Sequence, residues 1–316
     1  MELISILMPA YNAGKYIEAS ILSVLKQSYA DWELIIINDG STDNTKEIVE
    51  RYSKKDSRIK LINQVNQKMA AARNNGIKNS KGAWIAFLDS DDLWEPEKLS
   101  LQIQASKEHP TAGVIYSDGF IFNDHEQFNN LMPYPTVTGR LLSHDVMYQM
   151  QYQQNYIPVL SVIVKRSLVD TIGPQNEERV FSGCEDWDYW LRIARVGADF
   201  YGLSQKLFYY RRHETNVSKN SVNMLLAQLA VLTKNYEPRL INSGDLSNAL
   251  KKIFFPLINN LIKLRRFDDA YFAIKETDEI LPSITFKTIK FLIKSFGRLA
   301  HIPVAIIGRL ESLQLK

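Results

Sequence analysis

Four acidic residues follow a short apolar run in the stretch WIAFLDSDDLWEPEKL, which covers residues 84–99. Asp89, Asp91 and Asp92 come directly after the run, and Glu95 follows them. Carboxylates this close repel one another, so a folded chain needs positive charge to hold them. Their hard oxygens suit Mg²⁺ or Mn²⁺, and such ions in turn bind phosphates. The stretch therefore predicts a metal–diphosphate site. The alternative is a solvated turn in which an aspartate caps the next helix.

An alternation of strands and helices precedes the acidic stretch and would position it. Apolar runs predict strands at 3–9, 32–39, 59–64 and 83–89. The segments between them have helical spacing, at 16–28, 40–55 and 69–80. This order is typical of a parallel sheet with helices on both faces, whose ligands bind at the carboxyl ends of the strands. Three polar clusters follow those ends, at 9–12, 38–40 and 89–92.

The rest of the chain changes from a mixed to a helical pattern. Helices are predicted at 99–109 and 185–197, strands at 112–122 and 206–213, a loop at 127–139, and a strand leading into a helix at 161–173. After residue 220 only helices are indicated, including a helical hairpin at 246–280. We therefore expect an α/β domain at 1–220 and an all-α region at 221–316.

Composition excludes several classes of protein. The 316 residues are 45% hydrophobic and 23% charged, which is ordinary for a soluble globular protein. A net charge of +3 does not indicate a nucleic-acid partner. The single cysteine, Cys184, excludes a multi-cysteine zinc site and fits a reducing cytoplasm. No apolar run approaches the roughly 18–20 residues that span a bilayer, so we expect a cytoplasmic protein without a membrane span.

Other phosphate-binding folds match poorly. The sequence has no P-loop and no dinucleotide-binding glycine fingerprint after its first strand. A haloacid-dehalogenase phosphatase would want Thr or Val where this chain has Leu93. A nucleotidyltransferase would want a loop rich in glycine and basic residues after the first strand, where this chain has PAYNAGKY.

Several ordered motifs resemble glycosyltransferase family 2. They are ISILMPAYNAGKYIEASILSVLKQSYADWELIIINDGSTDNT, AAARNNGIKNSKGAWIAFLDSDDLWEPEKL, SVIVKRSLVDTIG, EDWDYWLRIARVG and YYRRHETNVS, and they cover roughly residues 3–218. The resemblance implies the GT-A fold, a Rossmann-like mixed, mostly parallel sheet flanked by helices. It also implies an inverting, metal-dependent hexosyltransferase that uses a UDP- or dTDP-linked sugar and Mn²⁺ or Mg²⁺. A non-catalytic nucleotide-sugar-binding protein of the same fold is the alternative.

The resemblance assigns the acidic stretch and a histidine to the metal and donor. Its D-x-D motif falls on Asp89-Ser90-Asp91, so Asp91 would hold the metal and Asp89 would face the ribose or sugar. His213, at the end of YYRRH, would reach the metal or diphosphate. Asp92 would cap the following helix.

The ends of the first two strands would bind the nucleotide. The residues implied are Pro9, Ala10, Tyr11, Asp39, Asn66 and Arg73. Asp39 could accept the ring N–H of uracil, or it could only cap the helix after it. Tyr11 could merely pack, and Arg73 could be an exposed helical arginine.

The motif CEDWD would supply the catalytic base. The resemblance points to Asp186 as the base and to Glu185 as a ligand of the acceptor or sugar. Asp188 would be a helix N-terminal charge, and a nucleophilic role for Cys184 is not expected. Trp187 and Trp190 would divide between an acceptor platform and the core, with Trp190 in the core.

The acceptor would be a glycan, a lipid-linked sugar or a protein, and the loops at 123–140 and 150–160 would set sugar specificity. Residues 286–316 carry six Lys or Arg residues and one acid, and the apolar residues at 286, 289, 292, 293 and 296 share one helical face. This face could lie on the inner surface of the cell membrane. Alternatively, it could dock on the protein or form a homodimer.

Overall fold

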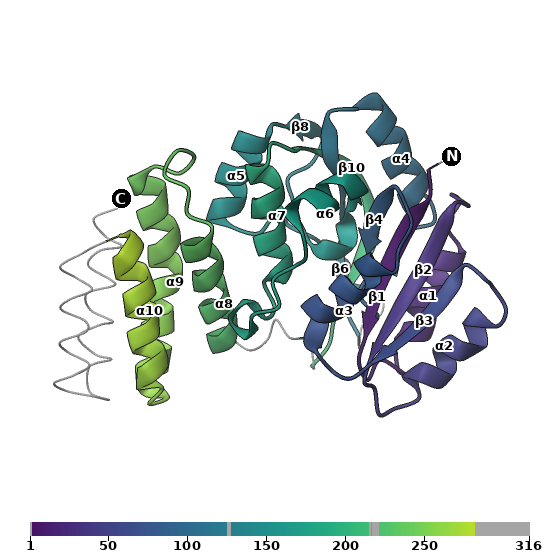
Figure 1. Cartoon of the computed structure of the whole chain (residues 1–316), viewed down its shortest axis with the longest axis horizontal. Coiled ribbons are helices and arrows are strands. Elements are labelled where there is room, and N and C mark those ends of the chain that lie inside the picture. The colour runs from purple at the N-terminus through teal and green to yellow at the C-terminus, as the bar shows by residue number, and fades with distance from the viewer. Residues whose placement is uncertain (1, 125–127, 215, 217–220, 282–316) are drawn as a thin grey trace. The chain divides into compact units, whose positions relative to one another are not determined.

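The computed structural model describes residues 2–124, 128–214, 216 and 221–281 of the chain (Figure 1). The chain divides into two compact units. The first consists of Met1–Tyr148, Asn155–Glu177 and Arg192–Asn216, and the second of Gln149–Gln154, Glu178–Leu191 and Val217–Lys316. The predicted division into domains at 1–220 and 221–316 remains a prediction.

The first unit is built on one mixed sheet with the strand order β3-β2-β1-β4-β9-β6-β10-β5. The strands are β1 Ile4–Ala10, β2 Trp32–Asp39, β3 Ile59–Gln64, β4 Trp84–Phe87, β5 Leu93–Trp94, β6 Ala112–Asn123, β7 Met132–Pro133, β8 Arg140–Leu142, β9 Ile163–Lys165 and β10 Asp199–Arg212. β1 is parallel to β2 and β4, β2 to β3, and β10 to β6, whereas β9 is antiparallel to β4 and β6. The predicted mixed, mostly parallel α/β sheet is confirmed.

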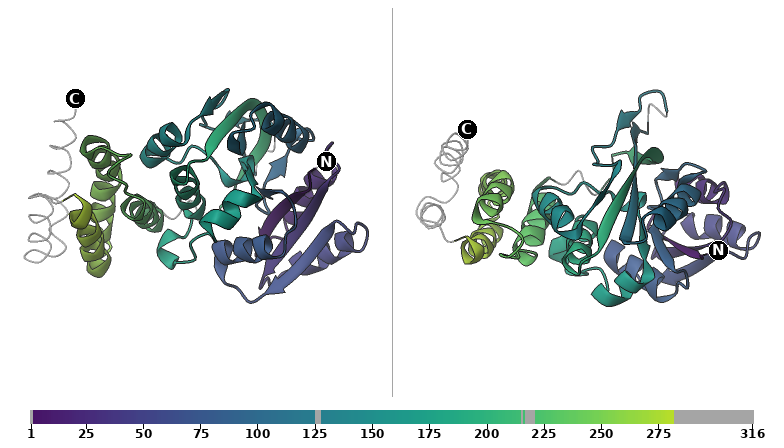
Figure 2. Two further views of the ribbon diagram at one scale, coloured as in Figure 1. Left: turned by 45° about the horizontal axis from the view of Figure 1, so that its top comes forward. Right: turned by 90° about the horizontal axis from the view of Figure 1, so that it is seen from above.

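Helices cover both faces of the strands β1 and β2 (Figure 2). All residues of both strands are buried, which explains their continuous apolar runs. Ile4, Ile6 and Met8 share a core with α1 (Ile17–Leu25) and α2 (Thr45–Ser53). On the other face, α3 (Lys68–Lys78) approaches closely through Gly76, where an added Cβ would lie 2.9 Å from Ile37 Cδ1. The alternation of side chains along each strand thus feeds two cores.

The remaining helices of the first unit are α4 (Lys98–Glu108) and α6 (Arg166–Ile172), with a short 3₁₀ helix at Val159–Ser161. Two helices run from one unit into the other, α5 (His144–Gln153) and α7 (Glu185–Arg195). The sequence pattern did not predict α5. It also placed the start of the last strand at residue 206, whereas β10 begins at Asp199 and pairs along β6.

Parallel pairing brings three polar clusters to one edge of the sheet. Ala10 pairs with Asn38 and Leu7 pairs with Phe87, so β1, β2 and β4 end together. The segments 9–12, 38–40 and 89–92 follow these ends, as the sequence predicted.

The described part of the second unit is helical. Its helices are α8 (Ser221–Lys234), α9 (Ser243–Lys263) and α10 (Phe267–Ile280), with a 3₁₀ helix at Arg179–Phe181. Asn242 caps α9, since its Oδ1 accepts the Asp245 N–H at 2.9 Å. α9 and α10 form the predicted helical hairpin (Figure 1). None of the described helices is both long and apolar enough to cross a membrane. The predicted amphipathic segment 286–296 lies outside the described residues.

Candidate active site

The acidic stretch forms a tight loop at the carboxyl end of β4. Leu88 N–H still donates to Leu7 O at 3.0 Å, and Asp92 N–H then donates to Asp89 O at 3.2 Å. The turn between them presents the carboxylates of this segment at the edge of the sheet.

Asp89 is paired with an arginine of the neighbouring helix. Its Oδ1 accepts a hydrogen bond from Arg73 Nη2 at 2.8 Å. Arg73 projects from α3 and is only 2% exposed, so it is not the exposed helical arginine that the sequence left open. The pair keeps a buried guanidinium neutralised and leaves Asp89 partly accessible.

Asp91 lies against the predicted histidine. Asp91 Oδ2 is 2.7 Å from His213 Nε2, so the two proposed metal ligands meet although they are 122 residues apart in the chain. The ring of His213 stacks on Tyr16 with centroids 4.9 Å apart, and its backbone N–H donates to Asn216 Oδ1 at 2.5 Å. Both the ring and the backbone of His213 are thereby held in place.

Asp92 does not cap α4, and that prediction is wrong. Its Oδ1 accepts the backbone N–H of Arg211 on β10 at 2.7 Å, whereas the N-cap position of α4, Glu97, makes no side-chain capping bond. Asp92 is 1% exposed, and its Oδ2 has no hydrogen-bond partner among the described residues. Burial, reinforced by the charges of Asp91 and Asp89, raises the pKa of Asp92 well above its ordinary value. A buried carboxylate oxygen without a partner is a place for a cation or a proton.

The loop after β1 is tied to the loop after β2. Asn12, at φ 50°, donates its N–H to Ser41 Oγ at 3.0 Å and accepts the Thr42 N–H at 2.8 Å. Gly14 lies close to the loop after β2, since an added Cβ would be 2.0 Å from Asn44 Oδ1 and the Asn44 side chain would have to move. Pro9 and Ala10 end β1 just before this loop, and Tyr11 is 53% exposed. Tyr11 thus presents its ring to solvent instead of packing in the core.

Asp39 is 4% exposed and already accepts three hydrogen bonds. Its Oδ1 accepts from Gln64 Nε2 and from the Gln67 N–H, both at 2.8 Å, and its Oδ2 accepts from the Lys68 N–H at 2.9 Å. Asp39 therefore holds the N-terminus of α3, and not that of the helix that follows it in sequence. Asn66 lies beside it, since an added Cβ on Gly40 would be 2.9 Å from Asn66 N.

Glu185 and Asp186 belong to the second unit, in the first turn of α7. Glu185 Oε2 accepts the Gly183 N–H at 2.9 Å, and Asp186 Oδ1 accepts the Trp187 N–H at 2.7 Å. The N-terminus of a helix is a favourable place for negative charge. The structure thus presents both carboxylates of the predicted pair at one helix end.

The neighbours of this pair are structural. Asp188, in the same helix turn, accepts from Asn235 Nδ2 at 2.8 Å. Trp187 and Trp190 are both buried, and the Trp187 indole donates to Gln151 O at 2.6 Å, so neither forms an exposed platform. Burial raises the pKa of Cys184, which disfavours the thiolate and a nucleophilic role.

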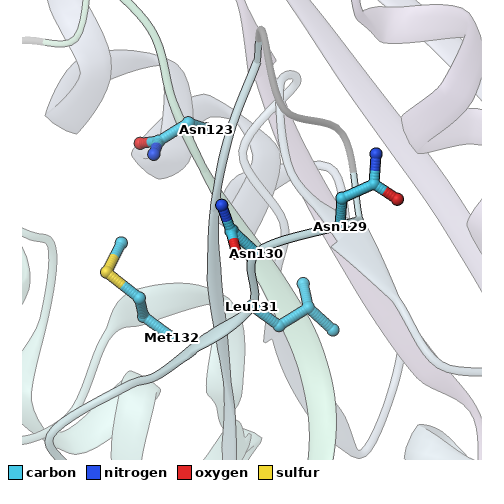
Figure 3. A pocket seen from close by; sticks show the side chains of 5 residues that line it. All are labelled: Asn123, Asn129, Asn130, Leu131 and Met132. Carbon is cyan, nitrogen blue, oxygen red and sulfur yellow. The ribbon is translucent and has the colours of Figure 1, made fainter.

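A hollow of about 450 Å³ lies in the loop region that the sequence linked to sugar specificity (Figure 3). It is lined by Asn123, Asn129, Asn130, Leu131 and Met132. Carboxamides both donate and accept hydrogen bonds, which is what sugar hydroxyls need.

Sequence reasoning missed Arg211, whose Nε donates to Asp91 O at 2.7 Å. The signal was present: Arg211 and His213 are separated by one residue in the strand predicted at 206–213, and alternate side chains of a strand lie on the same face. Among the described residues, no three His, Cys, Asp or Glu side chains form a group that could hold a metal ion by themselves.

Comparison with known proteins identifies the family. The model of the family described as Glycosyl transferase family 2 matches residues 5–162. The chain is 34% identical over 275 residues to the UDP-Glc:alpha-D-GlcNAc-diphosphoundecaprenol beta-1,3-glucosyltransferase WfgD of Escherichia coli. This match covers 84% of the present chain and 96% of WfgD.

Two solved structures share the fold. S. aureus TarS 1-349 in complex with UDP-GlcNAc superimposes with a TM-score of 0.68 at 18% identity, over 100% of this chain and 93% of that one. The mannosyltransferase PcManGT from Pyrobaculum calidifontis, in complex with GDP-Man and Mn2+, gives 0.59 at 15% identity, over 98% and 87%. The predicted GT-A fold and family are confirmed: this chain is a glycosyltransferase and belongs to glycosyltransferase family 2.

Proposed function

We propose that this enzyme moves a hexose from a UDP- or dTDP-linked donor to a hydroxyl of a glycan or lipid-linked acceptor, with inversion and with a divalent metal at the diphosphate. The observation that carries the proposal is the 2.7 Å contact between Asp91 Oδ2 and His213 Nε2 at the carboxyl end of β4. WfgD is named for a UDP-Glc donor and a diphosphoundecaprenol-linked acceptor, and the TarS structure contains UDP-GlcNAc. Both names support a UDP-sugar donor.

The residues at this edge fit Mn²⁺ or Mg²⁺. Asp91 offers a carboxylate, His213 offers a ring nitrogen, and the buried Oδ2 of Asp92 has no partner among the described residues. Ions of this kind are commonly held by one or two carboxylates together with substrate phosphates and water. Asp91 and His213, with Asp92 beside Asp91 in the chain, therefore suit a metal that completes its coordination with the donor diphosphate. When bound, the metal neutralises charge on the leaving diphosphate.

The other residues at the edge would hold the nucleotide and sugar. The base and ribose would bind at the exposed ring of Tyr11 and at Pro9 and Ala10, which form the carboxyl end of β1. Asp39 and Asn66, which lie close together, would complete this part of the site. Asp89, oriented by Arg73, would bind the ribose or the donor sugar. A partly accessible carboxylate paired with a buried arginine suits this role, because it is held in one geometry before the donor arrives.

Asp186 would act as the general base. Its carboxylate would take the proton of the acceptor hydroxyl as the hydroxyl oxygen attacks the anomeric carbon, and Glu185 would orient the acceptor or sugar. As part of this proposal, the enzyme works in the cytoplasm, where a lipid-linked acceptor would present its sugar at the inner face of the membrane. Residues 1–220 would form the catalytic domain.

A donor screen tests the function. Nucleotide-sugars would be offered with Mn²⁺, and the slow release of free nucleotide by hydrolysis would be measured. We expect release from a UDP- or dTDP-sugar that chelation of the metal stops. Asp91→Asn should abolish metal-dependent UDP binding in calorimetry while the fold is kept. Wild-type affinity in this variant would refute the assignment of Asp91.

A further inference from the structure

We propose that Arg211 is a positioning residue that fixes the loop carrying Asp91 and Asp92, and that Asp124 is its anchor. This inference rests on the proposed function, because it assigns Arg211 a role in presenting the metal ligands. Nothing in the sequence motifs or the comparisons assigns a role to either residue.

Arg211 contacts the acidic loop through two different groups. Its Nε donates to the backbone carbonyl of Asp91 at 2.7 Å, and its backbone N–H donates to Asp92 Oδ1 at 2.7 Å. The first contact fixes the main chain of the D-x-D motif, and the second fixes the carboxylate beside it. Because both donors belong to one residue on β10, the loop after β4 is attached to that strand at two points.

The guanidinium is itself held on three sides. Nη1 donates to Asp124 Oδ1 at 3.0 Å, and the guanidinium carbon lies 4.8 Å from the ring centroid of Tyr16 and 4.6 Å from that of Phe122. Side-chain exposure of both Arg211 and Asp124 is 12%. A planar fork bound to one carboxylate and placed beside two rings has little rotational freedom, which is what a positioning group needs.

Asp124 is anchored independently of Arg211. Its Oδ2 accepts from Lys15 Nζ at 2.6 Å and from the Tyr16 hydroxyl at 3.0 Å. The hydrogen bond from Lys15, followed by those from Tyr16 and Arg211, lowers the pKa of Asp124 to about 2. The carboxylate is therefore anionic at neutral pH and keeps its attraction for Arg211 there.

The same cluster reaches the second metal ligand. Tyr16, which binds Asp124, also stacks on His213 with centroids 4.9 Å apart. His213 comes two residues after Arg211, just beyond the end of β10. Asp91 contacts Arg211 and His213 stacks on Tyr16, so both take their positions from groups attached to Asp124. Outer residues of this kind typically change metal affinity or activity by about 10- to 100-fold when they are altered.

The test compares Arg211→Lys with Arg212→Lys, its exposed neighbour on β10, as the matched control. Lysine keeps the charge but lacks the fork that binds Asp91 O and Asp124 together. Calorimetry would measure UDP binding with and without Mn²⁺, and urea unfolding would confirm the fold. We expect Arg211→Lys to weaken metal-dependent UDP binding about 10- to 100-fold, with metal-free UDP binding within twofold of the control.

A second variant keeps the inference testable if Arg211→Lys does not fold. Asp124→Asn should give the same selective loss, and the double variant should lose little more than either single variant because the two residues act together. Equal binding by Arg211→Lys and Arg212→Lys would overturn the inference, as would equal loss with and without metal. If the losses of UDP affinity in the two single variants add fully in the double variant, Asp124 does not act through Arg211 and is not its anchor. Metal-independent UDP binding by the wild type would instead refute the proposed function.

Discussion

Asp39→Asn separates the two roles that Asp39 could have, nucleotide recognition and support of α3. In the structure, one oxygen of Asp39 accepts from Gln64 and Gln67, and the other accepts from the Lys68 N–H at 2.9 Å, its one donor among the described residues. The asparagine oxygen would keep the first pair of bonds. Its NH₂ group would then face the Lys68 N–H. Because both groups are hydrogen-bond donors, the bond to Lys68 would be lost.

The structural cost can be worked out from these contacts. Losing one hydrogen bond to a charged acceptor costs about 1.5–3 kcal/mol. Losing negative charge at the N-terminus of α3 adds about 0.3–1 kcal/mol. Lys68 has φ 74°, a strained conformation for a residue with a side chain, and its bond to Asp39 helps to hold it. We therefore expect the free energy of unfolding to fall by about 2–4 kcal/mol, measured as a lower urea midpoint with an unchanged m-value.

Nucleotide preference then distinguishes the roles. Uracil carries a ring N–H that a carboxylate can accept, whereas the corresponding nitrogen of cytosine is an acceptor that an asparagine NH₂ can serve. If Asp39 binds the base, Asp39→Asn should reduce the preference for UDP over CDP by about 10-fold or more, because one charged hydrogen bond is lost. Asp56→Asn is the control, since Asp56 binds Arg58 just before the amino end of β3. If UDP and CDP affinities fall by the same factor, Asp39 supports α3 and does not recognise the base.

Three further predictions follow from other parts of the chain. Asp186→Asn should bind the donor normally but transfer sugar about 10²–10⁴-fold more slowly, because deprotonation of the acceptor belongs to the transition state; turnover within a few-fold of wild type would exclude Asp186 as the base. The pKa of Asp124 is lowered to about 2, so its contribution to stability is present above about pH 4 and is lost as the pH falls towards 2. Asp124→Asn should therefore be less stable at neutral pH and lose less stability between pH 4 and 2, which urea midpoints at each pH would show; parallel curves would contradict this. If the basic C-terminal segment binds membranes, the full chain should float with anionic liposomes at low salt and a version ending near residue 282 should not. Equal behaviour of the two would exclude the membrane interpretation.

The sequence predicted those elements well whose hydropathy pattern is clear within a few neighbouring residues. β1 and β2 are buried on both faces, so their apolar runs are continuous and end sharply at polar residues. The helix α5, with the sequence HDVMYQMQYQ, gave no such signal. Its buried residues include Tyr148, Tyr152 and Gln151, whose polar atoms hide the apolar face in a hydropathy pattern.

The partners within the candidate site could not be predicted in the same way. Arg211 and Asp124 are 87 residues apart, and they meet because β10 runs parallel to β6 in a register with three shifts. Asp92 was predicted wrongly for the same reason. Its position before a helix suggested a helix cap, but its carboxylate accepts the backbone N–H of Arg211 on β10 instead. Local sequence indicates which residues are polar at a strand end, whereas strand register decides which of them touch.

The four acids of the opening stretch are held in four different ways, and the differences bear on the metal. Asp89 pairs with Arg73, and Glu95 accepts a hydrogen bond from the Tyr209 hydroxyl, so both have partners from the protein. Among the described residues, the carboxylate of Asp91 contacts a histidine ring, which is charged only when protonated, and Asp92 keeps one buried oxygen without a hydrogen-bond partner. Of the three aspartates, the two with an oxygen that an ion could reach without breaking an ion pair with arginine are therefore the adjacent residues Asp91 and Asp92. If the enzyme holds a divalent ion as proposed, the ion would lie between Asp91 and His213 and would offset the repulsion that Asp91 exerts on Asp92. Added Mn²⁺ should then raise the urea midpoint of the wild type, because a ligand that binds only the folded state stabilises it, and should raise that of Asp91→Asn less.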